Sequence, residues 1–200
     1  MRSLYRKVLP LLLTCALIVS QMSVFPGTMV NADEQPQGIY NAAFQKPVTT
    51  NGTIVNEANL NILTDGVRDR QFYVLIDVND GPKWCQVDLE SELPVVSINL
   101  VNDYNPDTPR TGRDIIIQLS NDPDFAVDVT TVFNNDADNS AGQGIGTDEE
   151  YEEPTDGSGK TVTLETPVFA RYVRVWSWGH LRVGETEYRM YNTPVEIEVY

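Results

Sequence analysis

The end of the chain alternates apolar and polar residues in two segments, residues 170–177 and 193–200. Such alternation is typical of a β-strand that has one face on a core. Shorter strand-like runs precede them, and clusters of Gly, Pro, Asn and Asp separate the runs. This pattern predicts a β-sandwich or barrel, without repeats and without a convincing amphipathic helix. The predicted strands are 85–89, 95–101, 114–119, 130–133, 161–165, 170–176 and 195–200.

The first 32 residues have the pattern of a secretory signal peptide. Arg2, Arg6 and Lys7 precede an apolar run at 8–19, and small residues at 30–32 offer a cleavage site. A retained membrane anchor is the alternative, but Pro10 and polar residues shorten the run below the ~20 residues of a span. We therefore predict a signal peptide at 1–32, a flexible leader at 33–39 and one domain at 40–200.

The segment 141–159 combines five glycines with six acidic residues. This composition predicts a long surface loop rather than a linker between domains.

The chain is strongly acidic, with 14 Lys and Arg residues against 29 Asp and Glu residues. Cleavage of the signal peptide would remove three basic residues and no acidic one, so the net charge would change from −15 to −18. A surface of this charge repels nucleic acid and anionic lipid. It is compatible with cation binding.

Cys85 would be the only cysteine of the mature chain, which rules out an intramolecular disulfide. In its predicted strand it shares a face with Val87 and Leu89. We therefore interpret Cys85 as a small buried hydrophobic residue rather than a reactive thiol.

The two terminal strands, together with the motifs at 41–48, 63–66 and 84–89, resemble the discoidin family, also called the coagulation factor 5/8 type C family. Family 32 carbohydrate-binding modules are similar. The resemblance covers about residues 41–200 and implies an all-β, eight-stranded jelly-roll β-sandwich that binds a ligand rather than catalyses a reaction. The missing disulfide departs from the animal members and favours a bacterial exported protein.

The resemblance also implies a structural Ca²⁺ ion that ties the first long loop to the last strand. The carried-over ligands are the carboxylates of Asp65 and Glu196 and the backbone carbonyls of Ile62, Val67 and Val195. Calcium takes six to eight oxygen ligands and accepts carbonyls as readily as carboxylates. The alternative is that Asp65 and Gly66 form a simple turn and that Glu196 is a solvated strand residue.

A second acidic stretch, Asn134 to Ser140, contains an Asp-x-Asp core but lacks the Gly and distal Glu of an EF-hand loop. We interpret it as a solvated Asx-rich turn and assign it no role.

Ligands in this fold are expected on loops at one end of the sandwich. A sugar site needs a flat apolar surface and a few polar groups that fix the hydroxyls. Trp178 could instead be partly buried under its own loop, and His180 could be a plain surface residue. The fucose-binding pattern of the family, a His followed at long spacing by Arg-x-Asp, is absent. The candidate ligand residues are Tyr104, Arg110, Trp178, His180 and Arg182.

An enzyme is disfavoured, because no Gly-x-Ser-x-Gly turn accompanies His180 and acid pairs can always be found among 29 carboxylates. An apolar loop tip at 72–75 could bind phospholipid, but the charge opposes anionic membranes. The sequence thus predicts a secreted or cell-surface, calcium-stabilised carbohydrate-binding module with a glycan as its partner. The alternative is an adhesion, protein-interaction or phospholipid-binding domain of the same fold.

Overall fold

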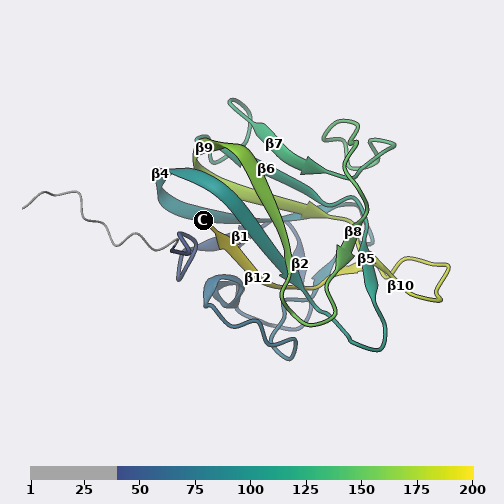
Figure 1. Cartoon of the computed structure of the whole chain (residues 1–200). Helices are drawn as coiled ribbons and strands as arrows, with labels where there is room; N and C mark the ends of the chain where they lie inside the picture. The colour runs from purple at the N-terminus through teal and green to yellow at the C-terminus, as the bar shows by residue number, and fades with distance from the viewer. Residues whose placement is uncertain (1–39) are drawn as a thin grey trace, which may run out of the picture. The chain divides into compact units, whose positions relative to one another are not determined.

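The computed structural model describes residues 40–200 (Figure 1). The predicted signal peptide at 1–32 and leader at 33–39 lie outside these residues. Within residues 40–200, no helix is long and apolar enough to cross a membrane. The elements are β1 (Val48–Thr50), β2 (Thr53–Ile54), the 3-10 helix η1 (Leu60–Thr64), β3 (Ile76–Asp77), β4 (Lys83–Asn102), β5 (Arg110–Gly112), β6 (Ile116–Ser120), β7 (Thr130–Asn134), β8 (Tyr151–Glu153), β9 (Lys160–Ser177), β10 (His180–Arg182), β11 (Tyr191–Asn192) and β12 (Pro194–Val199).

Two long strands, β4 and β9, run through both layers of a sandwich. The first half of β4 pairs with β1 and with the second half of β9, and β6 and β7 extend that layer. The second half of β4 pairs with β12 and with the first half of β9. The register shifts between Asp88 and Leu93, where both long strands curve from one layer into the other (Figure 1). The layers hold five and three paired segments, so the expected eight-stranded all-β sandwich is confirmed.

The sequence pattern divides each long strand in two, and this is wrong. Residues 85–89 and 95–101 belong to the single strand β4, and 161–165 and 170–176 belong to β9. Polar residues at 90–92 and Pro94 break the alternation in β4. They lie at the bend, where one face of the strand no longer meets the core.

The core lies between the two layers. Cys85, Val87 and Leu89 of β4 are buried on its inner face, and Ile98 and Leu100 are buried where the same strand has crossed to the other layer. Burial raises the pKa of the Cys85 thiol to about 12, so the thiol stays protonated. The prediction of Cys85 as a buried hydrophobic residue is confirmed.

One end of the sandwich carries a small three-stranded sheet, β10–β5–β8 (Figure 1). The prediction that Arg110, His180 and Arg182 lie in loops is wrong, since Arg110 begins β5 and the other two residues lie in β10. The predicted surface loop 141–159 contains β8, whose Tyr151 is fully buried. Strands of three residues are too short to show a period, so the pattern could not reveal them.

Candidate functional site

The pairing of β10, β5 and β8 brings charged side chains from three distant segments into rows. Arg110 lies opposite Arg182 on one side and opposite Glu153 on the other. Two positions along, Gly112 lies between His180 and Tyr151. Residues two apart in a strand share a face, so both rows lie on the same face of the sheet. This face is the inner one, since Arg110, Glu153 and His180 are only 7%, 5% and 8% exposed.

Arg110 and Glu153 of this face have defined partners. The guanidinium Nη1 of Arg110 donates to Oδ2 of Asp103 at 2.5 Å. Asn102 Nδ2 donates to Oε2 of Glu153 at 3.0 Å, and the same oxygen lies 3.2 Å from the hydroxyl of Tyr151. Charge-assisted bonds of this kind are strong when water is excluded. The arrangement is therefore rigid around Arg110 and Glu153.

Four buried side-chain atoms of this sheet nevertheless lack a hydrogen-bond partner, out of six such atoms in residues 40–200. They are Arg110 Nε, Glu153 Oε1, His180 Nε2 and Arg182 Nε. Arg110, Glu153 and His180 line a cavity of about 20 Å³. Because a buried polar group without a partner costs about 1–3 kcal/mol, these atoms favour contact with water or with another polar group.

Burial also shifts the titration of two groups around the cavity. It raises the pKa of Glu153 to about 7 and, together with the charge of Arg110, lowers the pKa of His180 to about 4. His180 is therefore neutral at pH 7. Its Nδ1 faces the carbonyl oxygen of Tyr191 at 3.2 Å, so the ring proton lies on Nδ1 and Nε2 is an acceptor.

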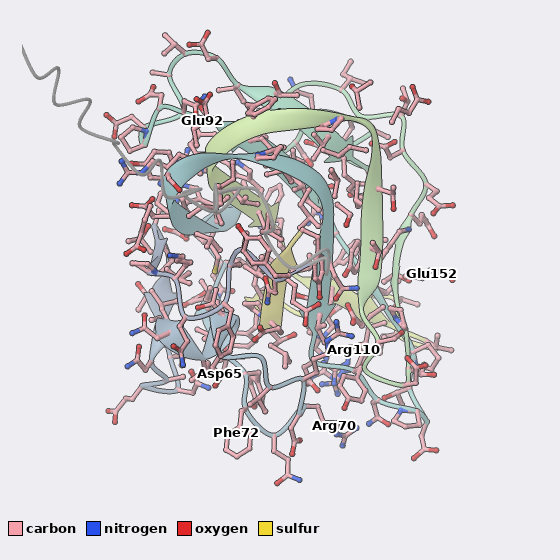
Figure 2. All side chains as sticks on the ribbon, turned by 60° about the vertical axis from the view of Figure 1, so that its left-hand side comes forward. Asp65, Arg70, Phe72, Glu92, Arg110 and Glu152 are labelled. Atoms are coloured by element: carbon pink, nitrogen blue, oxygen red, sulfur yellow. The ribbon has the colours of Figure 1, made fainter. Side chains whose placement is uncertain are left out.

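An open groove of about 410 Å³ lies outside the cavity. Arg110 and Glu153 border both the groove and the cavity. Their side chains lie on the inner face of the sheet, whereas Thr111 and Glu152 lie on the outer face, so the paired strands β5 and β8 separate the two spaces. Figure 2 shows Arg110 within this end of the fold and Glu152 at its margin. The groove is lined by Pro109, Arg110, Thr111, Glu152, Glu153, Pro154, Thr155 and Val183.

Trp178 lies in a different environment from Arg110 and Glu153. Its Nε1 donates to the carbonyl of Val78 at 3.1 Å, and the guanidinium of Arg113 lies 4.0 Å from the centre of its ring. The ring of Tyr188, which is 44% exposed, lies on the same guanidinium at 4.9 Å. Arg113 therefore covers one face of the indole of this candidate ligand residue.

Tyr104 has a structural contact too. Its hydroxyl donates to the carbonyl of Arg68 at 3.2 Å, and its own carbonyl accepts from Arg70 at 3.0 Å. A Cβ at Gly157 would lie 2.5 Å from the Tyr104 ring, so only glycine fits there. Tyr104 joins three loops and is not part of the charged rows.

The predicted calcium ligands meet at another corner of the fold. Glu196 is fully buried in β12, and its Oε1 accepts from the backbone N–H of Gly66 at 3.0 Å while Oε2 has no partner. Burial and the nearby carboxylates of Asp65 and Glu198 raise the pKa of Glu196 to about 8. The interpretation of Glu196 as a solvated residue is wrong. An unpartnered buried oxygen beside a second carboxylate fits a bound cation.

The backbone around Glu196 is compatible with carbonyl ligands. The pairing of β12 with β4 shifts register between Pro194 and Glu196, so Val195 falls outside the ladder. Residues 40–200 contain no group of three His, Cys, Asp or Glu side chains that could hold a metal ion. A calcium ion here would therefore take most of its oxygens from the backbone, as the resemblance implies for Ile62, Val67 and Val195.

The stretch Asn134 to Ser140 folds on itself. The carboxylate of Asp136 accepts from the backbone N–H groups of Ser140 and Ala141 at 3.0 and 2.8 Å, and Asn134 Oδ1 accepts from the N–H of Asp136. The predicted Asx-rich turn is confirmed, although Asp136 is buried rather than solvated. Its carboxylate accepts hydrogen bonds from backbone N–H groups of the turn.

No family model and no curated protein matches the chain. Solved structures do. Chitosan-binding module 1 of a chitosanase/glucanase from Paenibacillus sp. IK-5 is 22% identical, with a TM-score of 0.51 over 80% of this chain and 98% of that one. The carbohydrate-binding module CBM32 of AlyQ, in complex with 4,5-unsaturated mannuronic acid, is 16% identical, with a TM-score of 0.52 over 78% and 96%. The lectin domain of lectinolysin, complexed with Lewis B antigen, is 18% identical, with a TM-score of 0.53 over 81% and 96%.

The chain has the fold of these sugar-binding modules. The expected discoidin-type β-sandwich is thereby confirmed, and the low identities restrict that result to the fold.

Within this fold, the structure brings together three of the five candidate ligand residues, Arg110, His180 and Arg182. It places Trp178 and Tyr104 apart from them. Sequence reasoning missed Glu153, because nothing in the local sequence distinguishes it from the exposed Glu152. It also missed Asp103, for which the sequence carries no signal.

Proposed function

We propose that the protein is a non-catalytic carbohydrate-binding module that takes a glycan at the end of the sandwich formed by β5, β8 and β10. The observation that carries the proposal is the open groove of about 410 Å³ along β5 and β8, at the end of the sandwich. Grooves of this size that combine apolar walls with a few placed polar groups are typical of small-molecule sites.

The chemistry of the groove suits a saccharide. Pro109, Pro154 and Val183 supply apolar surface for the C–H groups of a sugar ring, while Thr111 and Thr155 add hydroxyls. The similar solved modules include ones named for chitosan, for an unsaturated mannuronic acid and for Lewis B antigen, which supports a glycan as the partner here. The same likeness to binding modules supports a protein without catalytic activity.

We also propose that calcium binds between the loop at Asp65 and strand β12, with Asp65 and Glu196 as carboxylate ligands. The support is the unpartnered Glu196 oxygen, which a cation would satisfy. The ion would have a structural role, holding the 62–67 segment to the last strand. Secretion and a bacterial origin rest on the signal-peptide pattern and the absent disulfide.

The phospholipid alternative loses its main support. Of the expected apolar tip at 72–75, Phe72 is 57% exposed and projects from the end of the fold in Figure 2, but Val74 is fully buried and its N–H donates to Pro194. A single exposed ring in a chain of net charge −15 is a weak anchor for an anionic membrane.

The test is a glycan array probed with the protein in calcium, with a parallel vesicle-sedimentation assay on phosphatidylserine vesicles. We expect binding to at least one class of glycan, which persists at moderate salt because stacking and hydroxyl contacts are short-ranged. Sedimentation with the vesicles and a blank array would contradict the proposal. A matched pair of variants locates the site: Thr111→Arg would fill the groove and abolish binding, whereas Thr49→Arg on the exposed part of β1 would not.

A further inference from the structure

We propose that the outer face of the small sheet β10–β5–β8 holds a second sugar subsite at Tyr188, so that the module binds a chain of neutral or amino sugars rather than a single sugar. This inference rests on the proposed function and extends the same site. It follows from two grooves on one face of the sheet and from the side chains that lie between them.

A second open groove, of about 390 Å³, lies on the same face of the sheet as the proposed sugar groove. Thr111 and Glu152 line the first groove and are paired on the outer face of β5 and β8. Arg113 lines the second groove, and its N–H donates to the carbonyl of Gly179, which continues the pairing of β5 with β10. Because Arg113 follows Thr111 by two residues, the two side chains share the outer face at a spacing of about 7 Å.

The segment after β10 returns along that strand and brings Tyr188 to the outer face. Arg189 pairs with His180, whose side chain lies on the inner face. Neighbouring residues of an extended segment point to opposite faces, so Tyr188 points outward, and its ring lines the second groove. Leu181 lies opposite Thr111 and also faces outward. An exposed surface therefore runs from Thr111 past Leu181 to Tyr188 without passing through the sheet.

The ring of Tyr188 gives the second groove a flat apolar surface. It is 44% exposed, and the guanidinium of Arg113 lies 4.9 Å from its centre and 4.0 Å from the centre of the Trp178 ring. These cation–π contacts hold the Tyr188 ring in place from one side. A ring that is both held and exposed is suited to stacking against the C–H face of a sugar.

Polar groups at fixed positions line the same groove. Asp114 Oδ2 accepts from the hydroxyl of Ser140 at 2.9 Å, and Asn135 Oδ1 accepts from the N–H of Ile115 at 2.7 Å. These bonds orient a carboxylate and an amide beside the Tyr188 ring. The groove thus combines an aromatic surface with a few placed polar groups, as a sugar site requires.

The charge of the second groove restricts the class of sugar. Its one guanidinium, that of Arg113, is paired with Asp114 at 3.2 Å, which leaves the carboxylate of Asp138 unbalanced. Hydrogen bonds from Ser140 lower the pKa of Asp138, so this carboxylate is ionised at pH 7. A uronate would bring a second negative charge to it, whereas a hydroxyl or acetamido group brings none and an ammonium group brings the opposite one.

The first experiment uses the wild-type protein and ladders of β-1,4-linked sugars of increasing length. Chains of glucose, mannose, N-acetylglucosamine, glucosamine and mannuronic acid are titrated, and binding is followed by NMR shifts of the protein amides. In at least one ladder without a carboxylate, the trisaccharide should bind roughly tenfold more tightly than the monosaccharide, because one chain occupies both grooves. The trisaccharide should also shift the amide signals of Arg113, Asp114 and Tyr188.

The ladders separate failure of the inference from failure of the proposed function. A gain with length below twofold in every ladder that binds, or an equal gain for mannose and mannuronate, would overturn the inference and leave the proposed function intact. If no ladder binds, the inference fails, and the glycan array decides separately whether the proposed function fails with it.

The second experiment removes the ring of the second groove. Tyr188→Ala should weaken trisaccharide binding roughly tenfold and leave monosaccharide binding within twofold, whereas Tyr188→Phe keeps the ring and should bind like wild type. Phe169→Ala removes a ring that is 62% exposed but lies outside the small sheet, and it should change neither affinity. If Tyr188→Ala weakens both ligands equally, or neither, the second subsite is not at Tyr188 and the inference is overturned. If Tyr188→Ala does not fold, the wild-type ladders still decide.

Discussion

Two buried glutamates, Glu196 in β12 and Glu153 in β8, differ in what surrounds them. Each has one carboxylate oxygen with a hydrogen-bond donor and one without, and burial raises the pKa of both. Glu196 lies near two more carboxylates, Asp65 and Glu198, whose charges raise its pKa further, while the charge of Arg68, which is paired with Glu198, lowers it. Glu153 lies beside Arg110, whose positive charge acts in the opposite direction.

The difference shows that a buried carboxylate has no function of its own. Where its neighbours are acidic, the negative charge is best satisfied by a cation, which is the proposed calcium site. Glu153 instead accepts from Asn102 and lies beside the ion pair of Arg110 and Asp103, at the border of the proposed sugar site. The predictions below test whether the two corners behave as differently as their surroundings require.

The largest effect is expected from removal of the counter-charge near Glu153. Arg110→Ala leaves the half-buried carboxylate of Asp103 without its partner and should lower the free energy of unfolding by about 2–4 kcal/mol, somewhat below the cost of breaking a fully buried pair. Urea unfolding measures it. The control is Arg171→Ala, because Arg171 and Asp88 form an ion pair with 42% and 28% of their side chains exposed, which is worth about 1 kcal/mol or less. Equal losses in the two variants would mean that the Arg110 pair is not buried as described.

The next largest effect is the response of stability to calcium, which should depend on Glu196 and not on Glu153. A ligand that binds only the native state at a hundredfold excess over its Kd stabilises the protein by about 2.7 kcal/mol, so the Tm should rise with calcium and fall with chelator. Glu196→Gln should lose this response, because it removes a proposed calcium ligand. Glu153→Gln also removes one buried carboxylate, but at the other site, and should keep the response. A calcium response that disappears in neither variant, or in both, would remove the distinction between the corners.

The pH dependence of stability should reveal Glu153. Its pKa is about 7 in the folded protein and 4.5 ordinarily, so between these values the native state holds a proton that the unfolded chain has released. Stability from this group is therefore full below pH 4.5 and is lost as the pH rises through 7. His180 acts in the opposite sense, with stability lost as the pH falls from 6.5 towards 4. Its contribution cancels when wild type is compared with a variant that keeps His180.

Glu153→Gln lacks this titration, so its stability relative to wild type should increase between pH 5 and pH 8, by an amount on the order of 1–3 kcal/mol. Thermal unfolding across that range checks it. Glu152→Gln serves as the control and should show a flat difference. A flat difference for Glu153→Gln as well would mean that Glu153 is ionised in the folded protein at pH 5.

The smallest effect is spectroscopic. His180 is the only histidine of the chain, so its ring protons can be followed by NMR without ambiguity. Because burial and Arg110 lower its pKa to about 4, the ring should stay neutral between pH 8 and pH 5.5. In Glu153→Gln, where the neighbouring carboxyl no longer titrates, the ring signals should therefore not shift over this range. A midpoint near 6.5 would place His180 in water and remove it from the cavity.

The sequence alone predicts much of the frame of this protein. Alternation along 85–89, 95–101 and 170–176 identifies the strands that build the core, because each has one face that must be buried. The resemblance to discoidin modules adds the pairing of Asp65 with Glu196, and the structure shows that these two residues lie together. The alternation can be recognised from the sequence because it repeats over many residues, and the pairing of Asp65 with Glu196 because it resembles the family's motifs.

The proposed sugar-binding end of the sandwich is determined only by the tertiary structure. Arg110, Glu153 and His180 come from segments 27 to 70 residues apart along the chain, and they meet because three strands of three residues pair in one register. Strands this short have no periodicity, and Glu153 follows a glutamate that is exposed. Nothing local distinguishes the two acids. Only the pairing of β5 with β8 turns Glu152 outward and Glu153 inward, since neighbouring residues of a strand point to opposite faces.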